Sequence, residues 1–97
     1  RRSLVRVDPT LPFAEAALFG CAVITGVGAV VNTAAMPKHS SLAVIGLGGV
    51  GLAALLAGHM LDASPIVAID LHEAKLAKAP PCRPACRIRS SRCRCRT

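Results

Sequence analysis

The chain has 97 residues, of which 53% are hydrophobic and 2% aromatic, and its formal net charge is +7. This length accommodates one small domain and excludes a two-domain enzyme. Residues 1–79 carry six Lys and Arg against five Asp and Glu, whereas residues 80–97 carry six Arg and no acid. The basic character therefore belongs to the tail alone.

The first segment predicts a strand followed by a helix. Residues 3–7 alternate polar and apolar side chains, as a short edge strand does, and Asp8-Pro9 closes that strand with a turn. A short helix is expected over residues 13–19, with Glu15 at its positive end. Gly20 is expected to end it.

A second helix is expected over about residues 26–35. Thr25 stands where a capping side chain is needed, and Gly26 and Gly28 are expected to permit close approach by another element. Residues 36–41 then predict a polar loop that begins at a proline stop.

The central stretch predicts two parallel strands joined by a helix. Residues 42–45 and 66–69 are continuously apolar and rich in Val and Ile, as strands covered on both faces are. The helix is expected over about residues 49–61, and Gly46-Leu47-Gly48-Gly49-Val50-Gly51 before it fits GxGxxG. Asp70 follows Gly51 by 19 residues, near the spacing of about 20 that dinucleotide-binding βαβ units show. Another helix is expected to start at Asp70.

Each part of this pattern suits the binding of a dinucleotide. Gly46 is expected to turn the chain sharply, Gly48 to let backbone approach a pyrophosphate, and Gly51 to bring the helix close to the sheet. Free N–H groups near Gly49 and Val50 would face the phosphates. Asp70 would accept hydrogen bonds from the adenosine ribose, and the absence of an Arg directly after it favours NAD over NADP.

The composition changes at residue 80, after which Ile88 is the one large aliphatic residue. Residues 80–97 are expected to be disordered, since they offer too little apolar surface to bury. The tail cysteines admit a zinc site, and its arginines admit nonspecific binding to nucleic acid or anionic lipid, but neither is favoured because no packed scaffold would fix the groups. These cysteines are Cys82, Cys86, Cys93 and Cys95.

Three stretches together resemble the cofactor-binding part of zinc-containing medium-chain alcohol dehydrogenases. They are FGCAVITGVGAVVNTA from Phe19, VIGLGGVGLAALL from Val44 and IVAIDLHEAKLAKA from Ile66, and the resemblance covers about residues 1–79. It implies an α/β fold: a partial Rossmann (βαβ) unit with flanking helices over residues 1–79 and a disordered basic tail over 80–97. It also implies an NAD-dependent oxidoreductase that passes hydride from a zinc-bound alcohol to nicotinamide.

The resemblance assigns roles to individual residues. Cys21 falls at a catalytic zinc ligand, and Thr25 and Val50 fall at positions that pack on the nicotinamide. The pyrophosphate turn corresponds to Gly46, Gly48, Gly49, Val50 and Gly51. Asp70 corresponds to the acid that binds the adenosine ribose, and Lys75 to a basic residue beside it.

Much of the family's machinery is missing from this sequence. The other zinc ligands and the proton-relaying Ser or Thr have no counterpart here, and a catalytic zinc needs three protein ligands. His39, His59 and His72 are not spaced as a metal site; the first two are expected to be a loop and a solvated residue, while His72 could edge the adenine pocket. We therefore expect no catalytic residue and no activity from this chain alone. The abrupt tail suggests translation in a shifted frame.

A membrane protein is the alternative from another class. Neither residues 16–36 nor residues 42–61 contain Asp, Glu, Lys or Arg, and each run is long enough to span a bilayer. The clustered glycines and the position of Asp70 favour the dehydrogenase reading instead. The resemblance to dehydrogenases implies an alcohol or aldehyde substrate, a homo-oligomer for the intact enzyme only, and neither a membrane nor a specific nucleic-acid partner. A cytoplasmic location is expected because Arg1-Arg2 leads into a charged, Pro-containing stretch and not into the apolar core of a secretory signal.

Overall fold

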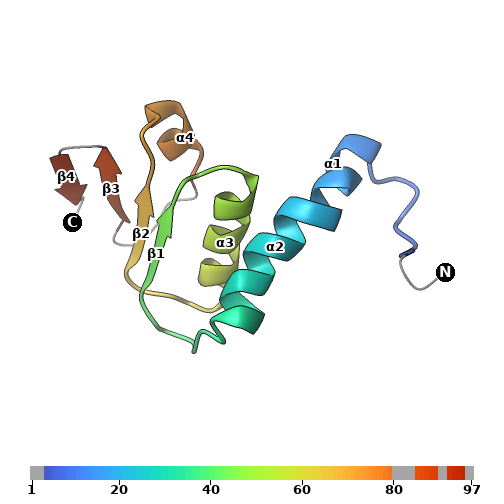
Figure 1. The fold of residues 1–97 in the computed structure, drawn as a ribbon, viewed down its shortest axis with the longest axis horizontal. Helices are drawn as coiled ribbons and strands as arrows, with labels where there is room; N and C mark the ends of the chain where they lie inside the picture. The colour runs from blue at the N-terminus through green and yellow to red at the C-terminus, as the bar shows by residue number, and fades with distance from the viewer. Residues whose placement is uncertain (1–3, 80–84, 90–91, 96–97) are drawn as a thin grey trace.

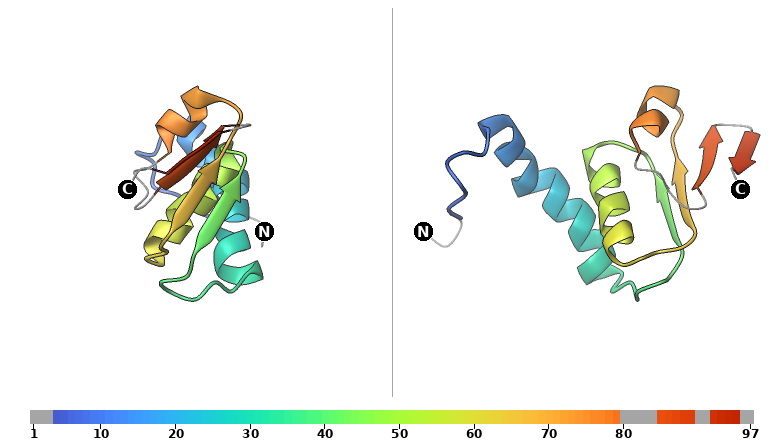
Figure 2. Two further views of the ribbon diagram at one scale, coloured as in Figure 1. Left: turned by 90° about the vertical axis from the view of Figure 1, so that its left-hand side faces the viewer. Right: turned by 180° about the vertical axis from the view of Figure 1, so that it is seen from behind.

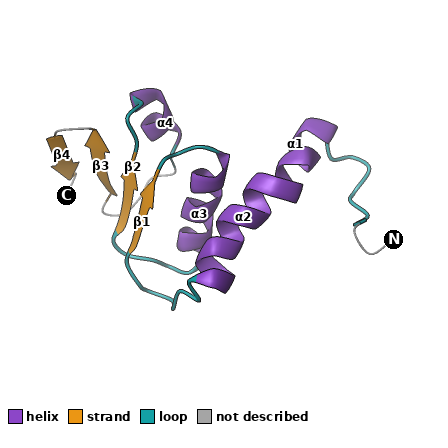
Figure 3. Cartoon of the chain, in the orientation of Figure 1, coloured by secondary structure: helices purple, strands orange, loops and turns teal. Residues whose placement is uncertain are grey.

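The structure is a computed structural model that describes residues 4–79, 85–89 and 92–95 of the chain, with side chains described over 4–79. Helices occupy the first part, and a parallel βαβ arrangement follows them (Figure 1, Figure 3). The expectation of a mixed α/β fold with a small parallel sheet is confirmed.

The N-terminal residues form no strand among those described. Residues 4–12 are irregular, and Leu4 and Val5 are exposed because no sheet edge lies beside them. The edge strand expected over residues 3–7 is therefore wrong for its described part. The turn at Asp8-Pro9 is confirmed: the Asp8 carboxylate accepts a hydrogen bond of 2.8 Å from the Thr10 N–H, and the Leu11 N–H donates to the Asp8 carbonyl.

One continuous helix replaces the two that were expected. It comprises α1 (Phe13–Leu18), α2 (Ile24–Gly28) and the wider π-helical turns η1 (Phe19–Val23) and η2 (Ala29–Thr33). Gly20 does not end it, because a terminating glycine takes a positive φ and the described glycine that does so is Gly46. Thr25 lies inside the helix and does not cap it.

The central arrangement agrees with the sequence pattern. Strand β1 (Leu42–Ile45) pairs in parallel with β2 (Ile66–Ile69), Leu42 opposite Ile66, and helix α3 (Gly49–Met60) connects them. Helix α4 (Glu73–Lys78) begins three residues later than expected. Its start is delayed because Asp70 and His72 keep extended or turn geometry while the Asp70 side chain bonds the His72 N–H.

Helix α3 lies between the sheet and the long helix, so that the described part of residues 4–79 forms three layers (Figures 1 and 2). The crossing of α2 and α3 is close because Gly26 has no side chain. A Cβ there would collide with the Val50 carbonyl oxygen and would lie 2.6 Å from Ala53 Cβ. Close approach was expected at Gly26 and Gly28; it is confirmed at Gly26, whereas a Cβ at Gly28 would meet only Asn32 of its own helix.

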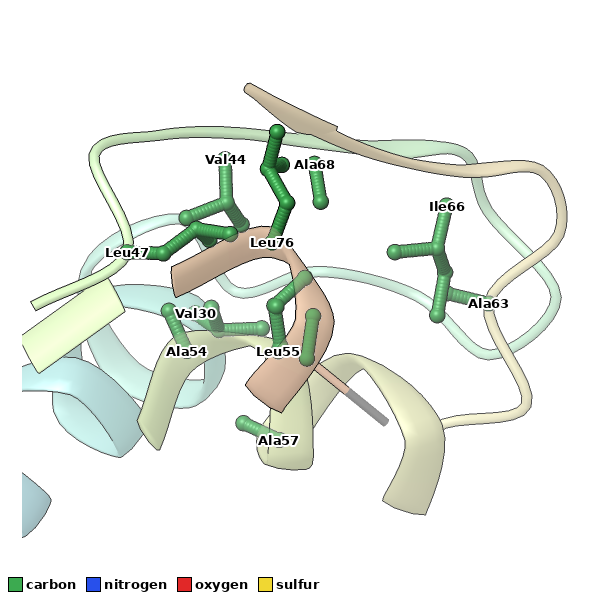
Figure 4. Packing of buried hydrophobic residues seen from close by; sticks show 11 residues of the cluster. Val30, Val44, Leu47, Ala54, Leu55, Ala57, Ala63, Ile66, Ala68 and Leu76 are labelled. Atoms are coloured by element: carbon green, nitrogen blue, oxygen red, sulfur yellow. The ribbon is translucent and has the colours of Figure 1, made fainter. Parts of the chain in front are cut away.

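The hydrophobic core sits between α3, α4 and one face of the sheet. Leu47, Leu55 and Ile66 are its largest fully buried side chains. Leu76 of α4 points into the same cluster beside Ala68 (Figure 4). This core fixes the position of the glycine turn, because Leu47 belongs to the turn and its side chain is buried in the core.

Two further strands lie in the segment for which no strand was expected. Strand β3 (Ala85–Arg89) pairs in parallel with β2, and β4 (Arg92–Cys95) pairs antiparallel with β3. The expectation of disorder does not hold for these two segments, because backbone pairing to the open edge of β2 requires no apolar periodicity. The rest of the tail, including Cys82, lies outside the described residues.

The opposite face of the sheet carries no helix among the described residues (Figure 2, left). Ile45 on that face is 82% exposed, whereas its neighbour Val44 on the α3 side is buried. A parallel sheet is normally covered on both faces, so this surface is unusual for a finished α/β domain.

The structure also bears on the membrane alternative. Phe13–Thr33 is, by length and composition, a candidate membrane span within the described residues, with a mean hydropathy of 1.9 and 11% of its window buried. The membrane alternative also required a spanning helix over residues 42–61, and this expectation is wrong. These residues form β1, a turn and the 12-residue helix α3, which is too short to cross a bilayer.

Candidate functional site

The glycine turn between β1 and α3 is built as the motif requires. Gly46 has a φ of +89°, which only glycine adopts without strain, and its N–H donates to the Ile69 carbonyl over 2.8 Å. A Cβ at Gly51 would collide with the Gly46 carbonyl oxygen, so only glycine lets α3 start so close to the strand. At Gly48 a Cβ would meet nothing within 4 Å, which leaves that side of the turn open.

The start of α3 presents backbone donors that the described structure does not use within the helix. Gly48 is the N-cap and supplies no side-chain capping bond, and the Leu52 N–H makes the first helical bond, to the Gly48 carbonyl. The N–H groups of Gly49, Val50 and Gly51 precede that bond. They lie at the positive end of the helix dipole, where an anion is favoured.

Asp70, at the carboxyl end of β2, reaches the glycine turn. Its Oδ2 accepts a hydrogen bond of 2.7 Å from the Leu47 N–H, and its Oδ1 accepts one of 2.8 Å from the His72 N–H. The residue is 8% exposed, and Lys75 Nζ lies 3.9 Å from Oδ2. The structure thus brings Asp70 and Lys75, which are five residues apart, to a turn residue, Leu47, that lies 23 residues before Asp70.

The hydrogen bonds keep Asp70 ionised. The His72 N–H and then the Leu47 N–H hold the pKa of the Asp70 carboxyl below its usual value, and Lys75 acts in the same direction, while partial burial opposes them. A carboxylate has about four acceptor positions, so the two backbone donors leave it capacity to accept more.

The residues expected beside the nicotinamide and the zinc lie on the long helix. Cys21 and Thr25 are both exposed, four residues apart. Their helix touches the first turn of α3 through the residues that directly follow them. A Cβ at Gly49 would lie 3.2 Å from the Cβ of Ala22, and Gly26 abuts Val50. The structure therefore brings their helix to the turn.

Within residues 4–79, whose side chains the structure describes, no group of three or more His, Cys, Asp or Glu is able to hold a metal. Cys21 alone does not fit a catalytic zinc, which takes three protein ligands. His39 lies in a loop, as expected, with a φ of 62°. His59 lies on α3, but it is half-buried and not fully solvated as expected. The zinc reading of the tail cysteines lies outside the described side chains.

Sequence reasoning missed two contributors, the backbone N–H groups of Leu47 and His72. Leu47 occupies a variable position of GxGxxG, so its identity gives no signal. The His72 contact had a signal: an Asp two residues ahead of a helix-starting position commonly bonds that backbone N–H.

No protein-family model matches the chain, but comparison with known proteins shows that it is similar to alcohol dehydrogenases. An alcohol dehydrogenase class-3 of Caenorhabditis elegans is 44% identical to it over 77 residues, which are 79% of this chain and 20% of the relative.

Solved structures agree. An alcohol dehydrogenase zinc-binding domain protein from Burkholderia ambifaria is 36% identical with a TM-score of 0.70, over 77% of this chain and 20% of its own. Benzyl alcohol dehydrogenase from Acinetobacter calcoaceticus is 39% identical with a TM-score of 0.68, over 77% and 21%. Alcohol dehydrogenase TADH from Thermus sp. ATN1 is 31% identical with a TM-score of 0.74, over 89% and 25%. The chain is therefore homologous to a segment of the zinc-type alcohol dehydrogenases and spans about a fifth of the curated relative's length.

Proposed function

We propose that residues 1–79 are the NAD-binding part, a partial Rossmann unit, of a zinc-type alcohol dehydrogenase. Support comes from the parallel β1–α3–β2 arrangement and from the similarity to alcohol dehydrogenases. NAD supplies the hydride acceptor when an alcohol is oxidised to an aldehyde or ketone. The part of the work that falls to this chain is to hold the dinucleotide.

The observation that carries the proposal is the contact between Asp70 and the glycine turn. It puts an ionised carboxylate on the N–H of Leu47, the residue directly before Gly48, and the N–H groups of Gly49 and Val50 follow in the same turn. A pyrophosphate at those N–H groups would leave the adjoining adenosine ribose at Asp70 and Lys75. Thr25 and Val50 are proposed to border the nicotinamide.

The same site favours NAD over NADP. Asp70 is ionised and buried, so a 2′-phosphate would meet a fixed negative charge there. Leu71, the residue directly after it, is apolar and exposed. Lys75 offers a counter-charge, but it already lies beside Asp70.

Cys21 is proposed as one zinc ligand, to be completed by residues beyond those described. Because the remaining ligands are not among the described residues, we assign no catalytic residue to this chain and expect no alcohol oxidation from it alone. Alcohols or aldehydes as substrates, a homo-oligomer of the intact enzyme and a cytoplasmic location belong to the same proposal.

Binding of NADH to the purified chain tests the proposal. The protein has no Trp and no Tyr, so nicotinamide fluorescence is measured without protein background. We expect saturable binding of NADH, weaker binding of NADPH, and an affinity for NADH about tenfold lower in Asp70→Ala, as for loss of a charged hydrogen-bond acceptor. Asp62→Asn is the charge control, because Asp62 is exposed, lies two residues after the end of α3 and has a φ of 52°, which asparagine tolerates. No saturation by millimolar NADH in a folded sample would refute the proposal.

A further inference from the structure

We propose that Asp70 is a positioning residue for pyrophosphate: it holds the glycine turn open for phosphates, in addition to accepting the ribose hydroxyls. This inference rests on the proposed NAD-binding function and concerns a different part of the ligand. The turn touches phosphate, whereas Asp70 acts on phosphate only through the Leu47 N–H.

The geometry of the turn shows why it needs such a contact. Gly46 leaves β1 with a φ of +89° and bonds the end of β2 through its own N–H, and the next N–H, that of Leu47, points to Asp70. Leu47 itself is 2% exposed, so its side chain and its N–H are both fixed. The direction of the following N–H groups, at Gly49 and Val50, depends on this fixed start.

The carboxylate is needed because two donors converge on it. Each of its oxygens accepts from a different backbone N–H, one local at His72 and one from the distant turn at Leu47. An amide in the same place has one acceptor oxygen and one donor group. In Asp70→Asn the oxygen is expected to stay with the local His72 N–H, leaving an NH₂ group opposed to the Leu47 N–H.

For a ligand without ribose, a charge effect and a positioning effect of Asp70 predict opposite changes in affinity. Asp70 is a negative charge near the phosphate position, so Asp70→Asn should tighten the binding of inorganic pyrophosphate if charge were the sole effect. If Asp70 positions the turn, the same change weakens pyrophosphate binding although the repulsion is smaller. The sign of the effect therefore separates the two roles.

The experiment compares ADP and inorganic pyrophosphate by calorimetric titration of the full chain. We expect Asp70→Asn to bind pyrophosphate about tenfold more weakly than the unaltered chain does, with Asp70→Ala at least as weak. Asp62→Asn removes one charge away from the turn and should leave both affinities unchanged. Lys75→Met should weaken pyrophosphate binding through charge while leaving the turn intact.

Hydrogen exchange at the Leu47 amide gives a second measurement that needs no ligand. It should be at least tenfold faster in Asp70→Asn and unchanged in Lys75→Met and Asp62→Asn. Pyrophosphate binding as tight as or tighter than in the unaltered chain, with ADP weakened, would confine Asp70 to the ribose and overturn the inference. If the unaltered chain binds neither ligand, the proposed function fails. In that case, unchanged exchange of the Leu47 amide in Asp70→Asn overturns the positioning role, whereas faster exchange supports the contact by which Asp70 fixes the turn.

Discussion

At the scale of single residues, Asp70 joins segments that are 23 positions apart. Its carboxylate accepts from the turn after β1 and from the start of α4, so both loops that follow the parallel strands depend on one side chain. The hydrogen bonds stabilise the ionised form and lower the pKa of Asp70. Ionisation of this residue is therefore linked to folding.

The lowered pKa predicts how stability changes in acid. The contribution of Asp70 is fully present above the carboxyl pKa of the unfolded chain, about 3.9, and is lost as pH falls through the lower pKa of the folded chain. The melting temperature should therefore fall more steeply below about pH 4 in the unaltered chain than in Asp70→Asn.

Thermal unfolding followed by circular dichroism between pH 7 and pH 2.5 measures this difference. Asp8, whose pKa is lowered by its bonds from Thr10, is present in both proteins and cancels from the comparison. Parallel pH curves for the two proteins would contradict the linkage.

The sequence predicted Asp70, Gly46 and Gly51 correctly as members of one turn-and-strand arrangement, because their spacing follows from the βαβ geometry. It did not predict the Leu47 bond, since a backbone N–H has no residue-type signature. The roles of Thr25, Lys75 and Cys21 in binding stay predictions.

At the scale of elements, the long helix shows the limit of local signals. Gly20 suggested a helix end, but a glycine in right-handed geometry continues a helix at a modest cost. What distinguishes Gly20 from Gly26 is tertiary: a Cβ at Gly20 meets nothing within 4 Å, whereas Gly26 abuts α3. The strands were predictable because their apolar runs are bounded by clear turn residues.

Alanine at these two glycines should have opposite effects. Gly20→Ala should stabilise the chain by about 0.5–1 kcal/mol through helix propensity. Gly26→Ala should destabilise it by about 1–3 kcal/mol, because the new methyl group forces α2 and α3 apart. Urea unfolding of the two variants measures both values, and equal shifts would show that the α2–α3 contact does not form.

At the scale of the whole molecule, the described sheet is covered on one face only. α3 and α4 bury one side, while Ile45 on the other is 82% exposed in an edge strand that carries no charge. Exposed apolar edge strands without charges or prolines promote association between chains. The curated relative, 20% of which matches 77 residues of this chain, is about four times as long as the chain, so it has further residues that can cover such a face.

We therefore expect the isolated chain to self-associate. Ile45→Lys should lower the average mass seen by light scattering at equal concentration, because a charge on the edge opposes pairing. It should do so without loss of helix content, since the Ile45 side chain contributes little to the core. Unchanged association in Ile45→Lys would move the contact to another surface, such as the long helix, where Phe13 is 94% exposed.

The glycine contact between the long helix and α3 has a consequence for detecting ligands. Ala22 and Gly26 lie against Gly49 and Val50, the same first turn whose N–H groups face the proposed phosphate position. An occupant of that turn would slow its fluctuations, and the helix beneath would register the change 20 to 30 residues upstream. Isotope labels at Ala22 and Gly26 thus become remote reporters of occupancy, readable without altering any group that would touch the ligand.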